Sequence, residues 1–390
     1  MKLVTTCEQH FLQLPDGSVW TKGTANKDYF SQFAGQFSAA LVVARVKQTN
    51  KIPRGFSRVD NKKIGFIALP DWLGPWGFVK NYFSIIKILK QELPDAAAYF
   101  LAMPSIISII LYKNFVKQPS GVHVVGDPET SFVGRPYLYY LFSKRFFTGW
   151  QKKICLNSNI SIYVADNLRQ VYPPAQRKNS VVASDIILKQ KDIAIRAKKI
   201  DNKHKNLIFV GTLSQLYKGQ RELVDAMRIC KDRGLKFKLK IIGGGIFAPL
   251  IKKRVLKNKL SREVNFLGSL NGFREIRKYL DQSEIFVLPS EQEGMPRALI
   301  EAMARGLVCI ASDVGGIPEV LDNKFLVQPK DKAVLAKKII EICDLDSEEL
   351  AKISKSNIAT ARRFIFKLLK NKREPFLKRL KKQTEKFYEI

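Results

Sequence analysis

A strand, a polar loop and a helix follow one another between residues 285 and 305, and this succession restricts the fold more than any other part of the chain. The apolar run 285–288 ends at Pro289 and leads into the loop SEQEGM. We predict a helix with Pro296 at its first position, where a missing N–H loses no hydrogen bond. Similar alternations of strands and helices recur along the chain and predict a parallel, doubly wound α/β sheet.

Two carboxylates flank the start of this predicted helix. Glu293 lies in the loop, and Glu301 follows eight residues later. Acids at this place often only complement the helix dipole. Here Glu301 lies about a turn and a half into the helix, so the two side chains reach different depths of one crevice. The free N–H groups between Gly294 and Arg297 form an anion site. A diphosphate on these amides, with sugar hydroxyls on the carboxylates, fits the arrangement.

The stretch around these acids resembles the E-x7-E signature of the retaining glycosyltransferases of family four. Glu293 and Glu301 match the two glutamates, and EAMA-x-G (301–306) and GG-x-P-E (315–319) match the continuation. LIFVGTLSQLYKG (207–219) and KLKIIGGG (238–245) resemble two further elements of the family, in the correct order. Two acids eight apart occur by chance in most chains, whereas ordered motifs over about 115 residues do not.

The resemblance implies the GT-B fold, in which two Rossmann-like, doubly wound α/β domains face each other across a cleft. It also implies transfer of a sugar from a nucleotide diphosphate sugar, with retention of configuration. The acceptor is expected to be a lipid-linked or cell-envelope glycan, or alternatively a soluble sugar or sugar phosphate. No D-x-D metal site of the other major glycosyltransferase fold is recognised, so neither a metal nor a cofactor is expected.

The resemblance also suggests roles for particular residues of the second half. Glu301 is expected to bind the ribose hydroxyls, while Glu293 orients the donor sugar and stabilises charge rather than acting as a nucleophile. Lys218 is expected to supply positive charge to the leaving diphosphate. The remaining donor-binding candidates form the glycine turn after the first strand and the start of the later helix: Gly211, Thr212, Gly294, Met295, Pro296 and Arg297.

Thr212 departs from the family pattern, because many members carry an arginine at this position that meets the donor phosphates. Either the phosphate clamp is weaker in this chain, or Arg297 contributes to it from the first turn of the helix. Arg297 is equally compatible with simply covering the helix surface.

The first half of the chain offers fewer and weaker candidates. Gly74 and Gly77 lie in the loop 71–77 after an apolar strand, where they either approach a ligand or only shape a turn. Asp127 lies in GVHVVGDPETS, where a strand ends, and is a catalytic candidate. His123 is either an acceptor-side residue or a core residue, because valines surround it.

Polar and charged residues at 188–206 separate two alternations of strands and helices. We predict an acceptor-side domain at 1–190, with an extension at 1–60, and a nucleotide-sugar domain at 200–350. Within the first domain, a hairpin is predicted around the Pro-Asp-Gly turn at 15–17 and strands at 39–46, 64–70 and 153–156. Residues 351–390 are predicted to form basic helices split by Pro375, which cross back to the first domain.

A net charge of +32 favours polyanionic partners, although many lysines are also compatible with a solvated surface. No nucleic-acid-binding module is recognisable, so nucleic acid is not an expected partner. Aromatic and basic residues alternate at 139–153, which predicts docking on an anionic membrane surface; alternatively, these aromatics fill the core.

Three further observations concern the compartment. Residues 96–112 form a stretch of 17 uncharged residues, near the length of a membrane span, but Pro104 divides it into a predicted buried strand and a helix. The five cysteines are scattered and suggest no disulfide or zinc site. The N-terminus has no apolar core typical of a signal peptide. We therefore expect a cytoplasmic protein that sits on the membrane surface without spanning it.

Overall fold

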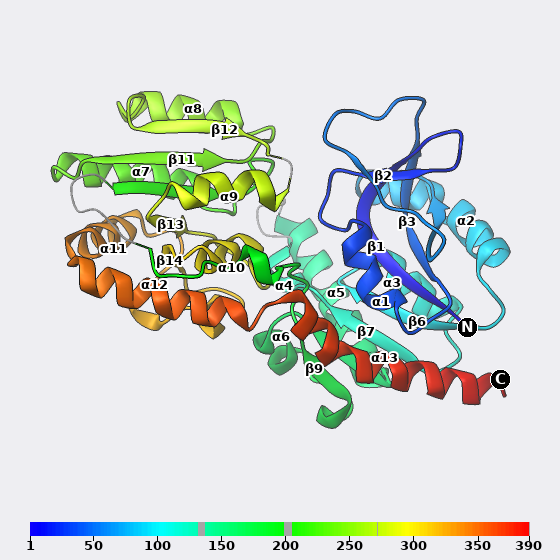
Figure 1. Ribbon diagram of the computed structural model, residues 1–390. Helices are drawn as coiled ribbons and strands as arrows, with labels where there is room; N and C mark the ends of the chain where they lie inside the picture. Colours follow the sequence, from blue (N-terminus) through cyan, green and yellow to red (C-terminus); the bar gives the residue numbers. More distant parts are fainter. Residues whose placement is uncertain (132–136, 199–204, 271, 390) are drawn as a thin grey trace. The chain divides into compact units, whose positions relative to one another are not determined.

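Two compact units make up the chain in the computed structural model, which describes residues 1–131, 137–198, 205–270 and 272–389 (Figure 1). Unit 1 comprises Met1–Ile187 and Leu369–Ile390, and unit 2 comprises Leu188–Leu368. Each unit is built on its own sheet of mainly parallel strands with helices against it, so the predicted α/β class with two Rossmann-like domains is confirmed.

The sheet of unit 1 is parallel throughout its main path. Its strands pair in the order β5-β3-β1-β6-β7-β8-β9. The bounds are β1 (Lys2–Gln13), β3 (Ala40–Gln48), β5 (Ile64–Leu69), β6 (Ala97–Met103), β7 (Ser120–Val124), β8 (Ile160–Tyr163) and β9 (Ser180–Val182). The direction of winding reverses between β1 and β6, which is the point where doubly wound sheets open a crevice at their carboxyl edge.

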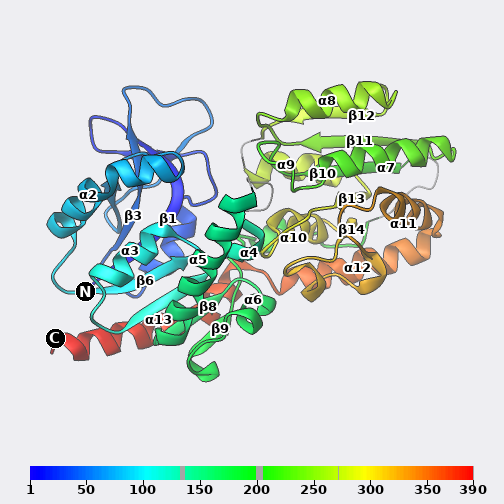
Figure 2. The ribbon, with the colours of Figure 1, turned by 180° about the vertical axis from the view of Figure 1, so that it is seen from behind.

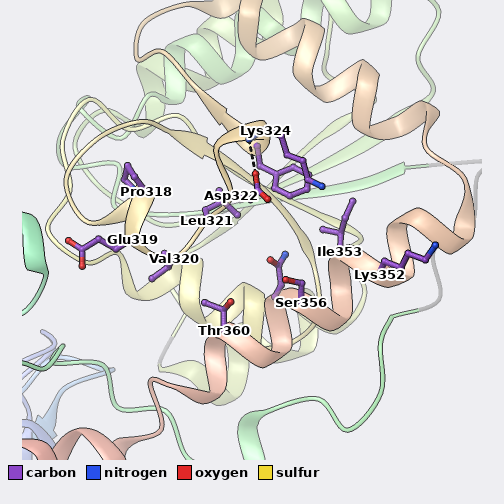
Figure 3. A pocket seen from close by; sticks show the side chains of 12 residues that line it. Pro318, Glu319, Val320, Leu321, Asp322, Lys324, Lys352, Ile353, Ser356 and Thr360 are labelled. Carbon is purple, nitrogen blue, oxygen red and sulfur yellow. Dashed lines mark hydrogen bonds between the residues drawn. The ribbon is translucent and has the colours of Figure 1, made fainter.

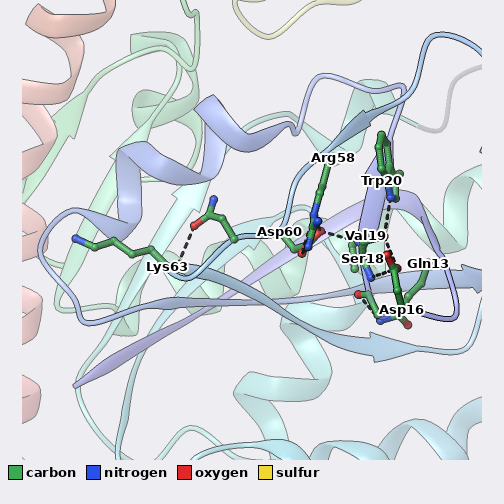
Figure 4. Close-up of polar contacts among 10 residues, drawn as sticks. Gln13, Asp16, Ser18, Val19, Trp20, Arg58, Asp60 and Lys63 are labelled. Atoms are coloured by element: carbon green, nitrogen blue, oxygen red, sulfur yellow. Dashed lines mark hydrogen bonds and ion pairs between the residues drawn. The ribbon is translucent and has the colours of Figure 1, made fainter.

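The first sixty residues are part of this sheet and not an extension of it, which corrects the sequence prediction. β1 lies between β3 and β6, with Val4 opposite Leu41 and Tyr99. The predicted hairpin forms as β1 turns into β2 (Val19–Thr21), which also pairs with β4 (Ser57–Arg58). Figure 4 shows how Asp16 closes the hairpin turn, since its carboxylate accepts the Ser18 N–H at 2.9 Å. Asp60 similarly accepts the Val19 N–H at 2.7 Å.

Helices cover both faces of the first sheet because successive strand residues point to opposite sides. Val42 packs in the cluster that holds Phe30 of α1, whereas its neighbour Val43 packs with Ile85 of α2. The helices of unit 1 are α1 (Lys27–Ala34), α2 (Gly74–Glu92), α3 (Ile106–Asn114), α4 (Pro128–Ser131), α5 (Tyr137–Asn157) and α6 (Asp166–Val171), with η1 (Arg177–Asn179) before β9.

Of two predictions for segments of unit 1, the structure confirms one and contradicts the other. The uncharged stretch at 96–112 forms β6 and α3, as predicted, with Ser105 capping the helix by accepting the Ser108 N–H at 3.0 Å. The strand predicted at 153–156 is wrong, since these residues belong to α5. Among the described residues, the structure has no helix with the length and apolar character needed to cross a membrane.

The sheet of unit 2 runs in the order β12-β11-β10-β13-β14-β15 and is also parallel. Its strands are β10 (Lys205–Val210), β11 (Phe237–Ile242), β12 (Val264–Gly268), β13 (Ile285–Leu288), β14 (Val308–Ser312) and β15 (Leu326–Val327). Its helices are α7 (Gln220–Asp232), α8 (Ala248–Lys257), α9 (Phe273–Asp281), α10 (Arg297–Ala304), α11 (Lys332–Asp344) and α12 (Ser347–Arg362), with short turns η2 (Gln190–Asp192), η3 (Ile317–Glu319) and η4 (Asn323–Phe325). The winding reverses between β10 and β13.

The described part of the predicted linker at 188–206 packs on unit 2. The Ala194 N–H donates to the Ala304 carbonyl at 2.8 Å, and the Lys198 ammonium donates to the Leu280 carbonyl at 2.9 Å. Residues 199–204 lie outside the described residues.

The C-terminal residues divide between the two units. α12 packs on α10 of unit 2, whereas the chain from Leu369 onwards belongs to unit 1. Pro375 lies inside a single helix, α13 (Phe366–Tyr388), so the predicted split at this proline is wrong. Arg373 anchors the helix: its guanidinium is fully buried and donates to Gln32 Oε1 at 2.7 Å and to the Ala183 carbonyl at 3.1 Å.

Candidate functional site

Lys218 and Glu293 form an ion pair at the carboxyl edge of the second sheet. Lys218 follows β10 and Glu293 follows β13, and these strands are parallel neighbours, with Leu207 opposite Ile285. The Lys218 Nζ lies 2.7 Å from Glu293 Oε1 and 2.8 Å from Oε2. Only 7% of the Glu293 side chain and 17% of the Lys218 side chain are exposed. The pair therefore sits where the winding of the sheet reverses, the usual ligand position in such folds.

Two residues that the sequence did not single out complete the surroundings of this pair. The buried Ser290 hydroxyl lies 2.7 Å from Glu293 Oε1 and donates to it. The ring of Tyr217 lies 5.3 Å from the Lys218 ammonium, within the range of a cation–π contact. Both residues could have been predicted from the sequence, because Ser290 is the first residue of the loop that contains Glu293 and Tyr217 directly precedes Lys218.

Glycines allow the loops around the ion pair to approach each other closely. Gly219 has φ +74°, and a Cβ there would lie 1.9 Å from the Pro289 carbonyl oxygen. Gly315 has φ +57°, and a Cβ there would lie 1.8 Å from the Glu293 carbonyl oxygen. Since any larger residue at either position would collide with backbone, the loops after β10, β13 and β14 depend on these glycines.

The turn after β10 is closed by its own hydrogen bonds. The Gly211 N–H donates to the Ile242 carbonyl at 2.9 Å. Thr212 Oγ1 accepts the Ser214 N–H at 3.1 Å, and its carbonyl accepts from Gln220 Nε2 at 2.7 Å. Thr212 therefore shapes the turn, and its short side chain leaves the arginine of the family pattern without a counterpart at this position.

The helix α10 begins one residue later than the sequence predicted. Pro296 is its N-cap in an extended conformation, with φ −73° and ψ 113°, and Arg297 is the first helical residue. No side chain caps this helix start among the described residues. Because proline has no N–H, the amides available to an anion are those of Gly294, Met295, Arg297 and the residues of the first turn. Arg297 is exposed, and Gly294 and Met295 are partly buried.

Glu301 lies one turn further along α10 and has an unusual environment. Burial raises the pKa of its carboxyl to about 7, an effect that Arg297 reduces and Asp192 reinforces. Within the described part of the chain, the carboxyl makes neither a hydrogen bond nor an ion pair. A partly buried carboxyl without a partner is suited to accept hydroxyl groups of a ligand.

The candidates of unit 1 have different surroundings in the structure. His123 is 2% exposed, stacks on Phe100 with ring centroids 5.5 Å apart, and has Nε2 3.1 Å from Asp185 Oδ1. This environment is that of a core residue and gives no support to an acceptor-side role. Asp127 accepts the Glu129 N–H at 2.9 Å and the Tyr172 hydroxyl, so its carboxylate holds the start of α4.

Gly74 and Gly77 belong to the first turn of α2 rather than to a loop, which corrects the predicted loop at 71–77. Gly74 has φ +64° and open space around it, whereas a Cβ on Gly77 would lie 3.3 Å from Trp72 Cβ. Only Gly77 is therefore in a close packing contact, and its neighbour there is the protein's own tryptophan.

A separate pocket of about 410 Å³ lies elsewhere in unit 2, between the segment 318–325 and α12 (Figure 3). Its lining includes Glu319, Asp322, Lys352 and Thr360 but none of the site residues described above. In the described ranges, no group of three or more His, Cys, Asp or Glu residues is arranged to hold a metal ion.

Sequence comparisons point to one family. The model of the family described as "Glycosyl transferases group 1" matches residues 190–360, which contain the Lys218–Glu293 pair and Glu301. Protein CapJ of Staphylococcus aureus is 22% identical over 309 residues, covering 78% of this chain and 77% of CapJ. A putative colanic acid biosynthesis glycosyltransferase, WcaL of Escherichia coli K12, is 31% identical over 147 residues, which is 35% of this chain and 36% of WcaL.

Solved structures of other proteins have a similar fold over nearly the whole length of this chain. Sucrose-phosphate synthase from Thermosynechococcus elongatus is similar with a TM-score of 0.74 at 16% identity, covering 98% of this chain and 99% of the other. HepE from Anabaena, solved with UDP and glucose, is similar with a TM-score of 0.67 at 15% identity, covering 97% and 99%. The matched family model places residues 190–360 in the glycosyl transferases of group 1, and the solved structures extend the similarity in fold to the rest of the chain.

Proposed function

We propose that the protein is a retaining glycosyltransferase of family four that moves a sugar from a nucleotide diphosphate sugar to a lipid-linked or cell-envelope glycan. The observation that carries this proposal is the buried Lys218–Glu293 pair beside the uncapped start of α10. A cation, a carboxylate and free helix amides meet there at one sheet edge. Of common metabolites, a sugar linked to a diphosphate has groups complementary to all three.

Each residue has a task in the proposed transfer. The amides of Gly294, Met295 and Arg297 hold the diphosphate, and Lys218 balances the charge that develops on it. Arg297, the first residue of α10, is assigned a second positive charge on the diphosphate, a role that Thr212 cannot fill. Glu301 accepts the ribose hydroxyls. Glu293, held by Ser290 and Lys218, orients the sugar and stabilises its positive charge at the transition state.

The proposed chemistry needs no protein nucleophile. The bond between the anomeric carbon and the diphosphate oxygen breaks while the acceptor oxygen forms its bond from the same face, so the configuration is retained. The acceptor hydroxyl gives its proton to the departing phosphate oxygen. Asp127 is the residue of unit 1 that we propose on the acceptor side, and Gly74 lies in open space at the start of α2.

The proposed class of acceptor has less support than the proposed donor. WcaL is named as a putative glycosyltransferase of colanic acid biosynthesis, and a net charge of +32 suits an acceptor that carries phosphate. The same charge suits a soluble sugar phosphate, which stays the second candidate. We propose a cytoplasmic location on the inner face of the membrane, where nucleotide sugars and lipid-linked glycans meet.

A thermal-shift panel of UDP, GDP, ADP and their sugars tests the donor, because a ligand that binds the folded state raises the melting temperature with concentration. NMR of the product anomer then tests retention. Stabilisation by no nucleotide in the panel, or an inverted product, contradicts the proposal. Transfer to a lipid-linked oligosaccharide supports the first acceptor class, and transfer only to a sugar phosphate supports the second.

A further inference from the structure

The outer face of α2 carries large apolar side chains in water. Trp76 is 84% exposed, Phe83 is 83% exposed and Val79 is 60% exposed, and Leu73 just before the helix is 80% exposed. The spacing of three and four residues places Trp76, Val79 and Phe83 on one side of adjacent turns. Single exposed apolar residues are common, but four neighbours on one face mark an interaction surface.

The fold itself does not require these side chains. α2 is attached through its opposite face, where Ile85 and Leu89 are fully buried against strand residues such as Val43 and Ile67. The face formed by Leu73, Trp76, Val79 and Phe83, named here the α2 face, packs against none of the core clusters of the described residues. Exposing this much apolar surface is unfavourable, so a partner that covers it is expected.

Charge along the same helix indicates the nature of that partner. Lys80, Lys87 and Lys90 are exposed. Lys80 follows Trp76 by four residues and Lys87 follows Phe83 by four, so the lysines lie on the same side of α2 as the α2 face. Glu92, the last residue of α2, is the only acidic residue of this helix. Just before the helix, Asp71 has its carboxylate paired with His10. Apolar side chains and lysines together on the exposed side of one helix suit contact with an anionic membrane, because the long lysine side chains can reach lipid headgroups beside the apolar residues.

A second helix adds to this surface. Leu141 and Phe142 in the first half of α5 are 41% and 71% exposed, and Arg145 beside them is exposed too. Tyr112 of α3 packs against both the α2 cluster and the α5 cluster, so all three helices cover one side of the sheet (Figure 2). Helices that follow parallel strands begin at the carboxyl edge of the sheet, so the α2 face and Phe142 lie toward the same edge.

We propose that the α2 face inserts into the headgroup region of an anionic lipid bilayer, and that it is the main membrane contact of unit 1. The segment 139–153, the sequence-based candidate, contributes less, because Phe146, Phe147 and Trp150 pack against the core. A second copy of the chain fits less well, since a two-fold contact through this face brings its own lysines together. The inference concerns binding alone and does not depend on which sugar is transferred.

Vesicle flotation of the full chain tests the proposal with four proteins. These are the wild type, Trp76→Ser/Phe83→Ser, Phe142→Ser, and the control Ile195→Ser/Leu256→Ser, whose residues are 93% and 64% exposed in unit 2. With phosphatidylglycerol–phosphatidylcholine vesicles, the α2 double variant is expected to lose about tenfold or more in binding. The control variant is expected to bind as the wild type does, and Phe142→Ser to lose less than the α2 variant.

Tryptophan fluorescence gives a second readout that does not rely on loss of binding. Trp76 is almost fully exposed, while Trp72 is 5% exposed and Trp20 and Trp150 are partly buried. Anionic vesicles are therefore expected to shift the wild-type emission to shorter wavelength. In Trp76→Phe the shift is expected to disappear while flotation persists, because phenylalanine still inserts.

The outcomes separate the alternatives. Flotation of the α2 double variant equal to the wild type overturns the proposal, and so does absence of wild-type binding to anionic vesicles. A concentration-dependent dimer that the same variant abolishes, without vesicle binding, assigns the face to self-association instead. Because none of these measurements uses turnover, vesicle binding in an inactive protein would sink the proposed function and leave this inference standing.

Discussion

The Lys218 ammonium lies 2.7 Å from Glu293 Oε1, and each charge is largely removed from water. Removal of either partner leaves the other as a mostly buried, unpaired charge, which is strongly unfavourable. In the proposed mechanism, a diphosphate that enters this site offers Lys218 a second anion. The pair would then hold both side chains in place before the donor arrives.

Substitution of this pair should lower turnover. We expect Lys218→Met and Glu293→Gln each to reduce kcat by about thirtyfold, near 2 kcal/mol, because each removes a charged contact to the donor. Glu293→Gln should change donor affinity less than kcat. The double variant should lose less than the sum, since the two residues act together. Lys330→Met is the control, because Lys330 pairs with Glu291 of the same loop but is 64% exposed. Near-normal turnover in both single variants would remove these residues from the mechanism.

Donor affinity should depend on pH through Glu301. With its pKa near 7 in the free protein, this carboxyl is protonated below that value and ionised above it. Ribose hydroxyls donate to the ionised form, so affinity should rise from about pH 6 to about pH 8 and binding should release protons in that range. Calorimetry in buffers of different ionisation enthalpy measures the release. Glu301→Gln should bind more weakly and without this dependence; a variant that keeps the wild-type profile would rule out Glu301 as its source.

The same raised pKa has an effect on stability with a defined sign. Between the ordinary pKa of a glutamate and about 7, the folded state keeps a proton that the unfolded chain has lost. The contribution of Glu301 to the free energy of unfolding therefore falls as pH rises through that window. Urea unfolding of wild type and Glu301→Gln across this range should show a smaller fall in the variant.

Gly219 should tolerate no side chain. In Gly219→Ala the new Cβ meets the Pro289 carbonyl oxygen, so the loops after β10 and β13 must separate, and we expect loss of activity with destabilisation of about 3 kcal/mol or more. Gly234→Ala is the matched control, because Gly234 has φ +84° with open space around it. Its strain alone should cost about 1–2 kcal/mol. Equal urea midpoints for the two variants would show that the close approach at Gly219 is unimportant.

Arg373 should contribute more to the stability of the fold than its exposed neighbour Lys372. Arg373→Met leaves Gln32 Oε1 and the Ala183 carbonyl without their buried donor, and we expect the free energy of unfolding to fall by about 3 kcal/mol. Lys372→Met, at an exposed position of the same helix, should change it little. Hydrogen exchange should then show earlier opening of α13 in the arginine variant alone. Unchanged exchange there would mean that other contacts hold the helix.

Chelation tests the expectation that the transfer needs no metal. We expect EDTA to leave the activity of the wild type unchanged, because helix amides and Lys218 neutralise the leaving diphosphate in the proposed mechanism. Activity that disappears with EDTA and returns with magnesium would show that a metal takes over that task.

The candidate donor site could be predicted from the sequence because its residues directly follow strands. Lys218 and Glu293 are distant in the chain, but the strands before them are parallel neighbours, so the motifs place them together. The pKa of Glu301 could not be predicted, since it depends on how α10 is buried. The predicted start of α10 is wrong by one position, because Pro296 is the N-cap and not the first helical residue. Sequence patterns do not locate helix ends to within one residue.

Unit 1 was harder to predict for physical reasons. β1 reads KLVTTCEQHFLQ, with polar residues at a register shift between Cys7 and His10, so its apolar pattern is interrupted. The residues KICL at 153–156 form a short apolar run, and such a run does not distinguish a strand from a buried turn of helix. His123 is flanked by valines, and only the structure shows the rings of Phe33 and Phe100 around it.

The division of the chain at Ile187 and Leu369 has a consequence for the order of folding. Unit 2 is continuous, so during synthesis it can fold as soon as its own residues are made. Unit 1 is interrupted by unit 2 in the sequence. It therefore cannot bind α13 until the whole of unit 2 has been synthesised. Until Arg373 arrives, the Ala183 carbonyl and the Gln32 amide lack the guanidinium that they contact in the finished fold. The unit that begins first is thus completed last.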